Sequence, residues 1–395
     1  MDELLPPILP AASWTQRADL AALFEALDPQ GGGGRYVGGA VRDTLLGAEA
    51  HDVDIATPHP PDEVTRRLEA AGIHVIPTGL AHGTVTAALP DGKVEITTLR
   101  RDVSTDGRRA TVAFADDWRE DAARRDFTIN ALYADPRSLE LFDYFGGLAD
   151  LAARRVRFIG DARQRIAEDH LRILRYFRFQ ARFGSRPADP EAEAACAELA
   201  PSLKALSRER VGWEMLAILR LPDPSPTVAR MAELGVLAEI LPQADPAALA
   251  ALVANECAEN VEPNDIRRLA ALLPPDPVVA EQTASRLRLS LTRKKRLVQA
   301  AGRECGNGGA RALAWRLGHD EAIDRLLLAG KSVAPLAGWI RPSFPLKGGE
   351  IVARGVVPGP EVARILKNVE SRWIDENFPD RGRVAALLDE ELARG

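Results

Sequence analysis

Two aspartates with a single residue between them are the feature of this chain whose spacing most directly suggests chemistry. Asp52 and Asp54 lie in the run Asp-Val-Asp-Ile. On a β-strand, residues i and i+2 face the same side, so both carboxylates would point one way while Val53 and Ile55 point into a core. Two close carboxylates repel each other unless a cation lies between them, and hard oxygen ligands suit Mg²⁺. Alone, such a pair is more often a solvated strand edge, so the metal site is predicted only in combination with other elements.

A glycine pair precedes the aspartates. Gly38 and Gly39 separate a strand-like run, 35–37, from a helical run, 40–46. Glycines let the backbone approach a ligand closely, and the start of the following helix offers amide donors to phosphate. Alone the pair fits a plain turn equally well; beside the aspartates it predicts a phosphate-holding turn next to a metal-holding strand, the two parts that nucleotidyl transfer needs. Glu95, on a further strand-like segment, could be a third acid of this site or a surface glutamate.

Two clusters of arginine lie further along the chain. Arg124-Arg125-Asp126 combines paired guanidinium groups with a carboxylate, which suits phosphate binding with one charge held by an internal partner. The alternative is a charged helix start followed by a buried strand. Between Leu151 and Gly184 lie nine arginines and only three acids, a stretch that could hold the phosphates of RNA or nucleotides although the net charge of the chain is −6.

The end of that basic stretch could read a base. Helical periodicity would place Asp169 beside Arg172, and then Arg175 and Arg178 along the same face. A carboxylate accepts from an exocyclic amino group while a guanidinium donates to a ring nitrogen, a pattern that fits cytosine and adenine and opposes uracil and guanine. Such a pair would accept CTP and ATP and reject UTP and GTP. By itself, a spiral of arginines is more often a solvated helix face.

These residues need a small sheet and a helix to position them. Strand-like and helical segments alternate through the first third, with strands expected at 35–37, 52–56, 74–76, 84–89 and 93–98 and helices at 15–27, 40–46 and 61–71. From Asp161 onward the pattern is almost wholly helical, with proline-rich breaks at 222–226 and 274–277. We therefore expect an α+β head that ends near Gly146-Gly147, followed by an all-helical remainder.

Composition bounds the class of protein. The three cysteines are scattered, and the histidines show no metal-ligand spacing, although His51 adjoins the aspartate pair. No apolar run is long enough to cross a bilayer, and the acidic, proline-broken first residues are not a secretory signal. We expect a cytoplasmic protein with reduced thiols, no membrane partner and no zinc. The sequence leaves the oligomeric state open.

In five motifs, which occur in the same order, the chain resembles the class II CCA-adding enzyme and bacterial poly(A) polymerase family. The motifs are V-G-G-A-V-R-D-x-L-L-G at 37–47, D-x-D-I at 52–55, T-T-L-R-R-D at 97–102, R-R-D-F-T-I-N-A-L at 124–132 and E-D-x-L-R-I-L-R at 168–175. They cover a little under half of the chain. The tail runs 347–350 and 357–362 also resemble the family, except that Glu350 stands where it usually has aspartate.

The resemblance implies a polymerase-β-like nucleotidyltransferase head over 1–147, a helical neck over 148–221, and a helical body and tail that bind tRNA over 222–395. It implies Mg²⁺ on Asp52 and Asp54, and base reading by Asp169 and Arg172. Nucleotide binding would also involve Gly39, Arg42, Arg125, Arg175 and Arg178. It implies that 100–114 form the flexible loop needed to switch from CTP to ATP, with its charged residues Arg101, Asp102, Asp106, Arg108 and Arg109.

The implied activity is template-independent addition of CCA to the 3′ end of tRNA from CTP and ATP, with release of pyrophosphate. Within the family the alternatives are a poly(A) polymerase or an enzyme that adds only CC or A. A catalytically silent RNA-binding protein of the same fold is the alternative from another class. The basic run Arg293-Lys294-Lys295-Arg296 could contact RNA phosphates or could be a solvated helix end.

Overall fold

The computed structural model describes residues 7–50, 52–106, 109–306 and 308–394, with the backbone alone for residues 81, 102–106 and 109–113. The chain divides into two compact units. One comprises Met1–Glu214 with Arg230–Ile240, and the other comprises Met215–Ala229 with Leu241–Gly395. No helix in the described ranges has the length and apolar character that crossing a bilayer requires.

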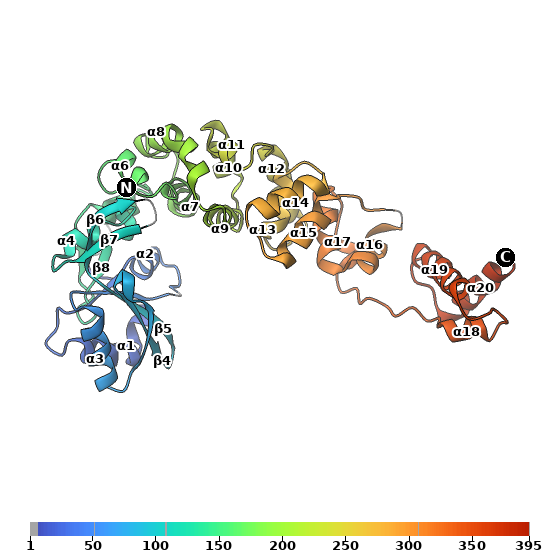
Figure 1. Cartoon of the computed structure of the whole chain (residues 1–395), viewed down its shortest axis with the longest axis horizontal. Helices are drawn as coiled ribbons and strands as arrows, with labels where there is room; N and C mark the ends of the chain where they lie inside the picture. Colours follow the sequence, from blue (N-terminus) through green and yellow to red (C-terminus); the bar gives the residue numbers. More distant parts are fainter. Residues whose placement is uncertain (1–6, 51, 107–108, 307, 395) are drawn as a thin grey trace. The chain divides into compact units, whose positions relative to one another are not determined.

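A seven-stranded mixed sheet forms the head of the first unit, and Figure 1 labels its strands β4, β5 and β8. Its order is β3-β4-β5-β2-β1-β8-β9, and only the β2–β5 pair is parallel. The strands are β1 (Arg35–Val37), β2 (Asp54–Thr57), β3 (His74–Gly79), β4 (Thr84–Leu89), β5 (Gly92–Thr98), β8 (Leu132–Ala134) and β9 (Leu141–Asp143).

Short helices support this sheet. On α1, Leu20, Leu23 and Leu27 are buried at helical spacing, and α1 packs beside α3, which in turn contacts β3 and β4 (Figure 1). The helices of the head are α1 (Ala18–Leu27), α2 (Gly39–Leu45), α3 (Pro61–Ala70), α4 (Trp118–Ala123) and α5 (Gly147–Ala152), with 3₁₀ turns η1 (Trp14–Gln16), η2 (Leu80–His82) and η3 (Thr128–Asn130).

The segment expected to be a flexible loop has regular secondary structure. β6 (Arg100–Asp106) and β7 (Arg109–Phe114) pair antiparallel as a separate two-stranded sheet, with an irregularity between Asp102 and Ser104. The described part of this segment is therefore a hairpin, and its flexibility stays a prediction. The β-branched residues of Thr-Val-Ala-Phe at 111–114 favour the extended conformation. Arg108 lies outside the described residues, as does His51.

Helices alone continue the first unit, and no strand follows Asp143 among the described residues. Aromatic side chains fix α7 to the head, because Phe179 lies 5.1 Å from Phe127 and Tyr176 stacks 5.8 Å from Phe158 between ring centroids. The elements are α6 (Ala162–Glu168), α7 (Arg172–Phe183), α8 (Pro190–Leu199), η4 (Ala200–Ala205), α9 (Arg208–Leu219), α10 (Ser225–Glu233) and α11 (Val236–Ile240). α9 and α10 contribute residues to both units.

The second unit is built of short helices whose starts follow from their sequences. Asp245, Asn264, Asp276 and Ser290 each accept a backbone amide at a helix N-cap, and prolines occupy the first helical position after Asp245 and Asp276. The elements are α12 (Pro246–Ala258), α13 (Asp265–Leu272), α14 (Pro277–Arg286), α15 (Leu291–Ala301), α16 (Gly309–Leu317), α17 (His319–Leu328), η5 (Ala334–Leu336), α18 (Gly348–Val352), α19 (Pro360–Asp375) and α20 (Arg381–Leu392).

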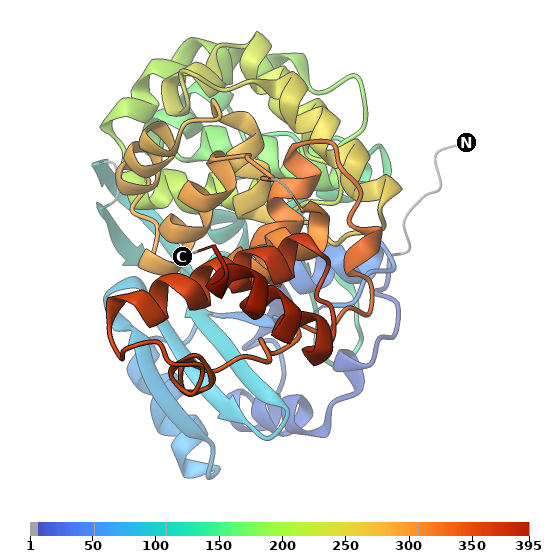
Figure 2. The same ribbon diagram turned by 90° about the vertical axis from the view of Figure 1, so that its right-hand side faces the viewer.

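The last three helices lie together in Figures 1 and 2, and their hydrophobic core contains the buried side chain of Trp373. An α+β head followed by helices confirms the predicted fold class. The division at 147 and 221 into head, neck, and body with tail stays a prediction, since the two compact units do not test it.

Candidate active site

The glycine turn of the head requires glycine at one position. Gly38 has φ 73° and ψ −119°, a conformation that side-chain-bearing residues rarely adopt. Its N–H donates to the carbonyl of Leu132 at 3.0 Å, and its own carbonyl accepts from the backbone N–H of Arg42 in α2. A Cβ on Gly38 would lie 3.5 Å from Nη1 of Arg125. The turn predicted to hold phosphate therefore lies against an arginine from a distant motif.

Strand register brings the carboxylates to the same place. In the antiparallel pair β1–β2, Val37 lies opposite Asp54, and in the parallel pair β2–β5, Asp54 lies opposite Glu95. Asp54 is therefore next to the residue that precedes the glycine turn. Val53 and Ile55 are buried as predicted, and Asp52 is exposed just before the strand. The strand begins at Asp54 rather than at Asp52, a shift of two residues.

The electrostatics of Asp54 fit a cation. Burial, followed by the nearby charges of Glu95 and Asp52, raises the pKa of Asp54 to about 6, while Arg125 opposes the rise. A divalent ion would relieve this repulsion. Among the described side chains no group of three or more His, Cys, Asp or Glu residues could hold a metal on its own. Carboxylate oxygens are donors that suit a hard divalent ion, so the donors at Asp52 and Asp54 fit one.

Arg125 is held in place by Asp121 and Tyr133, two residues that no motif predicted. Its Nη2 donates to Asp121 at 3.2 Å and its Nε to the hydroxyl of Tyr133 at 3.3 Å. Asp121 also accepts from Tyr133 at 2.7 Å and from Arg124 at 2.8 Å, and its side chain is 1% exposed. Burial alone would lower the pKa of Arg125, but Tyr133 and Asp121 hold it above its ordinary value. The available signal was the i, i+4 spacing of Asp121 and Arg125.

A chain of hydrogen bonds connects α2 to α7. The buried guanidinium of Arg42 donates to the side-chain oxygen of Asn130, and Asn130 donates to Asp126 at 2.9 Å. Asp126 in turn accepts from Nε of Arg175 at 2.8 Å. Although burial would raise it, the pKa of Asp126 is held at about 2, chiefly by Arg175. Burial lowers the pKa of Arg42, which lies 4.1 Å above the ring of Phe183. Arg42 and Arg175 are thus bound within the protein.

The expected pairing of Asp169 with Arg172 on one helix is wrong in detail. Asp169 has an extended backbone, φ −152° and ψ 104°, in the break between α6 and α7, because its side chain and carbonyl accept from Leu171 and Arg172 at the start of α7. Its carboxylate pairs with Arg210 of α9 at 2.6 Å. Arg172 pairs instead with Glu168 at 2.6 Å.

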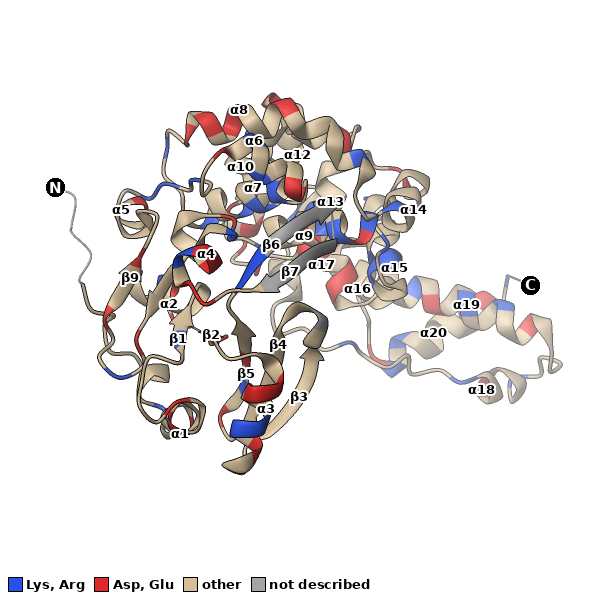
Figure 3. Ribbon diagram, turned by 60° about the vertical axis from the view of Figure 1, so that its left-hand side comes forward, with Lys and Arg blue, Asp and Glu red and all other residues tan. Residues whose placement is uncertain are grey.

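The remaining arginines of α7 follow its periodicity, and its basic residues are coloured in Figure 3. Arg178 pairs with the buried Glu214 at 2.8 Å, and Arg175 lies 3.7 Å from the same carboxylate. Neither Arg210 nor Glu214 was identified from the sequence, because both approach α7 from a separate helix.

The other predicted positions lie apart from this cluster or cannot be placed by side chain. Arg101 is exposed and lies 3.9 Å from Glu120, and the backbones of Asp102, Asp106 and Arg109 lie in β6 and β7. Gly39 begins α2 directly after the turn. The structure thus brings together Gly39, Asp52, Asp54, Glu95 and Arg125, and connects Arg42, Arg175 and Arg178 to them through internal partners.

Comparisons with known proteins agree with this arrangement. A family model described as the poly A polymerase head domain matches residues 35–157, and one described as the probable RNA and SrmB-binding site of polymerase A matches residues 188–248. The mitochondrial CCA tRNA nucleotidyltransferase 1 of Mus musculus is 36% identical over 363 residues, covering 86% of this chain and 82% of the mouse protein.

Two solved structures share the fold. One is the Bacillus stearothermophilus CCA-adding enzyme in complex with CTP, at TM-score 0.74 and 24% identity, covering 95% of this chain and 98% of that one. The other is the Thermotoga maritima CCA-adding enzyme complexed with tRNA, at TM-score 0.67 and 21% identity, covering 96% and 98%. With a relative this similar over most of both sequences, the chain belongs to the family of CCA tRNA nucleotidyltransferases, the CCA-adding enzymes.

Proposed function

We propose that this chain adds C, C and A to the 3′ end of tRNA from CTP and ATP, with Mg²⁺ and without a nucleic-acid template. The observation that carries the proposal is the strand register, which sets Asp54 between the residue that precedes the glycine turn and Glu95. Family membership supports the same reaction, since the similar enzymes of mouse, Bacillus and Thermotoga are CCA-adding enzymes.

A divalent metal ion is general for nucleotidyltransferases of this family. We assign Mg²⁺ to Asp52 and Asp54, with Glu95 as the third acid nearby, because these carboxylates lie close together and burial, followed by the charges of Glu95 and Asp52, raises the pKa of Asp54. When bound, such an ion neutralises phosphate charge and lowers the pKa of the attacking hydroxyl. The carboxylates would fix where the ion lies relative to the glycine turn.

The turn and Arg125 would bind the phosphates. Backbone at Gly39 can approach an oxygen closely, and the start of α2 favours an anion. Two of the nitrogens of Arg125 are used by Asp121 and Tyr133, while Nη1 lies at the turn. Because a guanidinium carries five N–H donors, Arg125 can donate to substrate without losing its internal partners.

The base would be selected on the neck. We propose that Asp169 accepts from the amino group of cytosine or adenine and that Arg172 donates to the ring nitrogen, with Arg210 holding the Asp169 carboxylate. Nucleotide binding by Arg42, Arg175 and Arg178 stays a prediction, and their internal partners favour a positioning role.

In the transfer step, the 3′-hydroxyl oxygen of the RNA bonds to the α-phosphorus while the bond to pyrophosphate breaks and the hydroxyl proton is released. The groups on this chain bind and align the reactants, and alignment of this kind supplies a large part of the rate. The tRNA is expected to lie along the helical part, its elbow on the body and tail. The cytoplasmic location also stays a prediction, since the mouse relative is named as mitochondrial.

The identity of the products tests this function. The protein is incubated with a tRNA that lacks its end and with CTP and ATP, singly and together, and the products are sequenced. We expect CC from CTP alone and CCA from both, with release of pyrophosphate. A poly(A) tract, addition of only CC or only A when both nucleotides are present, or RNA binding without Mg²⁺-dependent pyrophosphate release would each assign a different function.

A further inference from the structure

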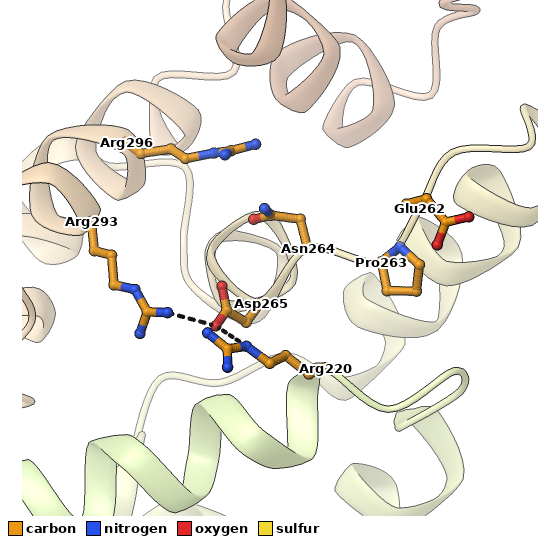
Figure 4. Close-up of a pocket in the computed structure, with 7 residues that line it drawn as sticks. All are labelled: Arg220, Glu262, Pro263, Asn264, Asp265, Arg293 and Arg296. Carbon is orange, nitrogen blue, oxygen red and sulfur yellow. Dashed lines mark hydrogen bonds and ion pairs between the residues drawn. The ribbon is translucent and has the colours of Figure 1, made fainter. Parts of the chain in front are cut away.

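A pocket in the second unit is lined mostly by charged side chains, and Figure 4 shows its lining residues. Its volume is about 550 Å³. Three arginines lie around the same space, Arg220 directly after α9 and Arg293 with Arg296 on α15. The rest of the lining is Glu262, Pro263, Asn264 and Asp265. The lining therefore has three cationic side chains against two acidic ones.

Helical spacing directs the four basic side chains of the run 293–296 to different sides of α15. Arg293 and Arg296, three residues apart, share the face of α15 that lines the pocket. Lys294 turns instead to α14, where its Nζ lies 2.8 Å from Glu281. Lys295 is exposed and does not line the pocket. Two of the four cations are thus directed to one place, which a uniformly solvated helix end would not require.

Internal partners hold each arginine while leaving donors for a ligand. One carboxylate oxygen of Asp265 accepts from Nε of Arg220 at 2.7 Å and, more weakly, from Nη2 of Arg293 at 3.4 Å. Arg296 donates to the fully buried Asp324 at 2.6 Å and 3.0 Å. Each guanidinium has five N–H groups, so these bonds orient the cations without exhausting them. Orientation in advance lowers the entropy lost on binding.

The start of α13 does not itself supply the donors. The side chain of Asn264 already accepts from the amides of Ile266 and Arg267, at 3.0 Å each. The three arginines therefore carry any anion affinity that this pocket has, and planar guanidinium groups match phosphate oxygens well.

We propose that this pocket binds phosphate and that its occupant is a phosphodiester of the RNA backbone, an inference that rests on the proposed function. The side chain of Arg220 is more than half exposed, and the pocket is far larger than one phosphate group. An RNA strand can therefore pass through the pocket. A free phosphate shares the same chemistry and is the alternative source.

The test compares Arg293→Gln with Lys295→Gln, which removes the same charge from the same helix outside the pocket. Binding of tRNA without its CCA end is measured in the absence of nucleotide at several salt concentrations. Arg293→Gln is expected to weaken binding about tenfold and to reduce the slope of log K against log salt by about 1. Lys295→Gln is expected to leave both near the wild-type values. Arg220→Gln, which leaves Arg293 on Asp265, should repeat the effect.

Thermal unfolding of each variant checks that the fold is kept, and inorganic phosphate is titrated in parallel. Equal tRNA affinities for Arg293→Gln, Arg220→Gln and the wild type would overturn the proposal. Loss of phosphate binding with unchanged tRNA binding would overturn the RNA occupant in favour of a free phosphate. The binding measurement contains no nucleotide and therefore does not depend on catalysis. A separate finding that the wild type does not add CCA would count against the proposed function and not against this site.

Discussion

At the scale of single residues, Arg125 is the proposed phosphate-binding group at the glycine turn, and Arg124 provides its comparison. The guanidinium groups of Arg125 and Arg124 both pair with the buried Asp121, at 3.2 Å and 2.7 Å, but of the two only that of Arg125 would lie within 4 Å of a Cβ on Gly38. Replacing either removes a partner of Asp121, so their structural costs are similar. Only the replacement of Arg125 would also remove the proposed contact with the substrate.

We therefore predict that Arg125→Gln raises the KM for CTP and for ATP by about tenfold or more, since a charge-assisted hydrogen bond contributes about 1.5–3 kcal/mol. Arg124→Gln should leave both KM values within a few-fold of the wild type. Steady-state kinetics with saturating tRNA measure the difference. Equal KM changes in the two variants would mean that the effect comes from the loss of a partner of Asp121.

Base selection is a second property of single residues. Asp169→Asn keeps the size of the side chain but adds donors where the amino group of the base needs an acceptor, so discrimination against UTP and GTP should fall. We expect the ratio of kcat/KM for CTP over UTP to drop at least about tenfold. Arg210→Gln removes the 2.6 Å partner of Asp169 but keeps its carboxylate, so it should change the ratio less. Unchanged selectivity in Asp169→Asn would refute base reading at this residue.

At the scale of elements, the ion pair of Asp126 with Arg175 fixes α7 to the head. The pKa of Asp126 is held at about 2, against 3.8 for an ordinary aspartate, so the folded state stabilises its charged form. A carboxylate with a lowered pKa contributes stability above its unfolded pKa, and this stability disappears as the pH falls through its folded pKa. The relevant window is therefore from about pH 4 down to about pH 2.

We predict that Asp126→Asn lowers the free energy of unfolding by about 2.5 kcal/mol near neutral pH. The difference in unfolding free energy between the variant and the wild type should disappear as the pH falls from about 4 to about 2. Urea unfolding at a series of pH values measures it. Glu69→Gln, at an exposed carboxylate of α3, serves as a control and should show no gap at any pH. A gap for Asp126→Asn that is independent of pH would contradict the ionic origin.

Secondary structure could be predicted where local pattern decides it. β1 and β4 have the predicted bounds, 35–37 and 84–89, and α2 begins one residue early. The error at Asp169 arose where a short polar contact competes with the local pattern. Asp169 leaves the helix because its own side chain and carbonyl accept from the next turn, and periodicity alone does not reveal this.

At the scale of the whole molecule, the motifs predicted residues that the structure brings together at the candidate site, but not the partners that hold them. The holding partners come from other segments of the chain, which packing alone brings close. Asp121 contacts Tyr133 and Arg125, Arg210 contacts Asp169, and Glu214 contacts Arg178. In the second unit, the sequence could not decide whether the run 293–296 contacts phosphate or is a solvated helix end. Its division between a pocket and an exposed face became visible only from the arrangement of α13 and α15.

The central claim is that the paired aspartates beside the glycine turn carry nucleotide transfer. The direct measurement is the rate of CMP transfer from CTP to a tRNA without its end, with Mg²⁺, for the wild type and for Asp52→Asn, Asp54→Asn and Glu69→Gln. We predict that either aspartate variant loses at least about a hundredfold in rate, since metal-assisted charge stabilisation contributes several kcal/mol. Glu69→Gln should match the wild type. A correctly folded Asp52→Asn or Asp54→Asn that transfers CMP at the wild-type rate would contradict the claim.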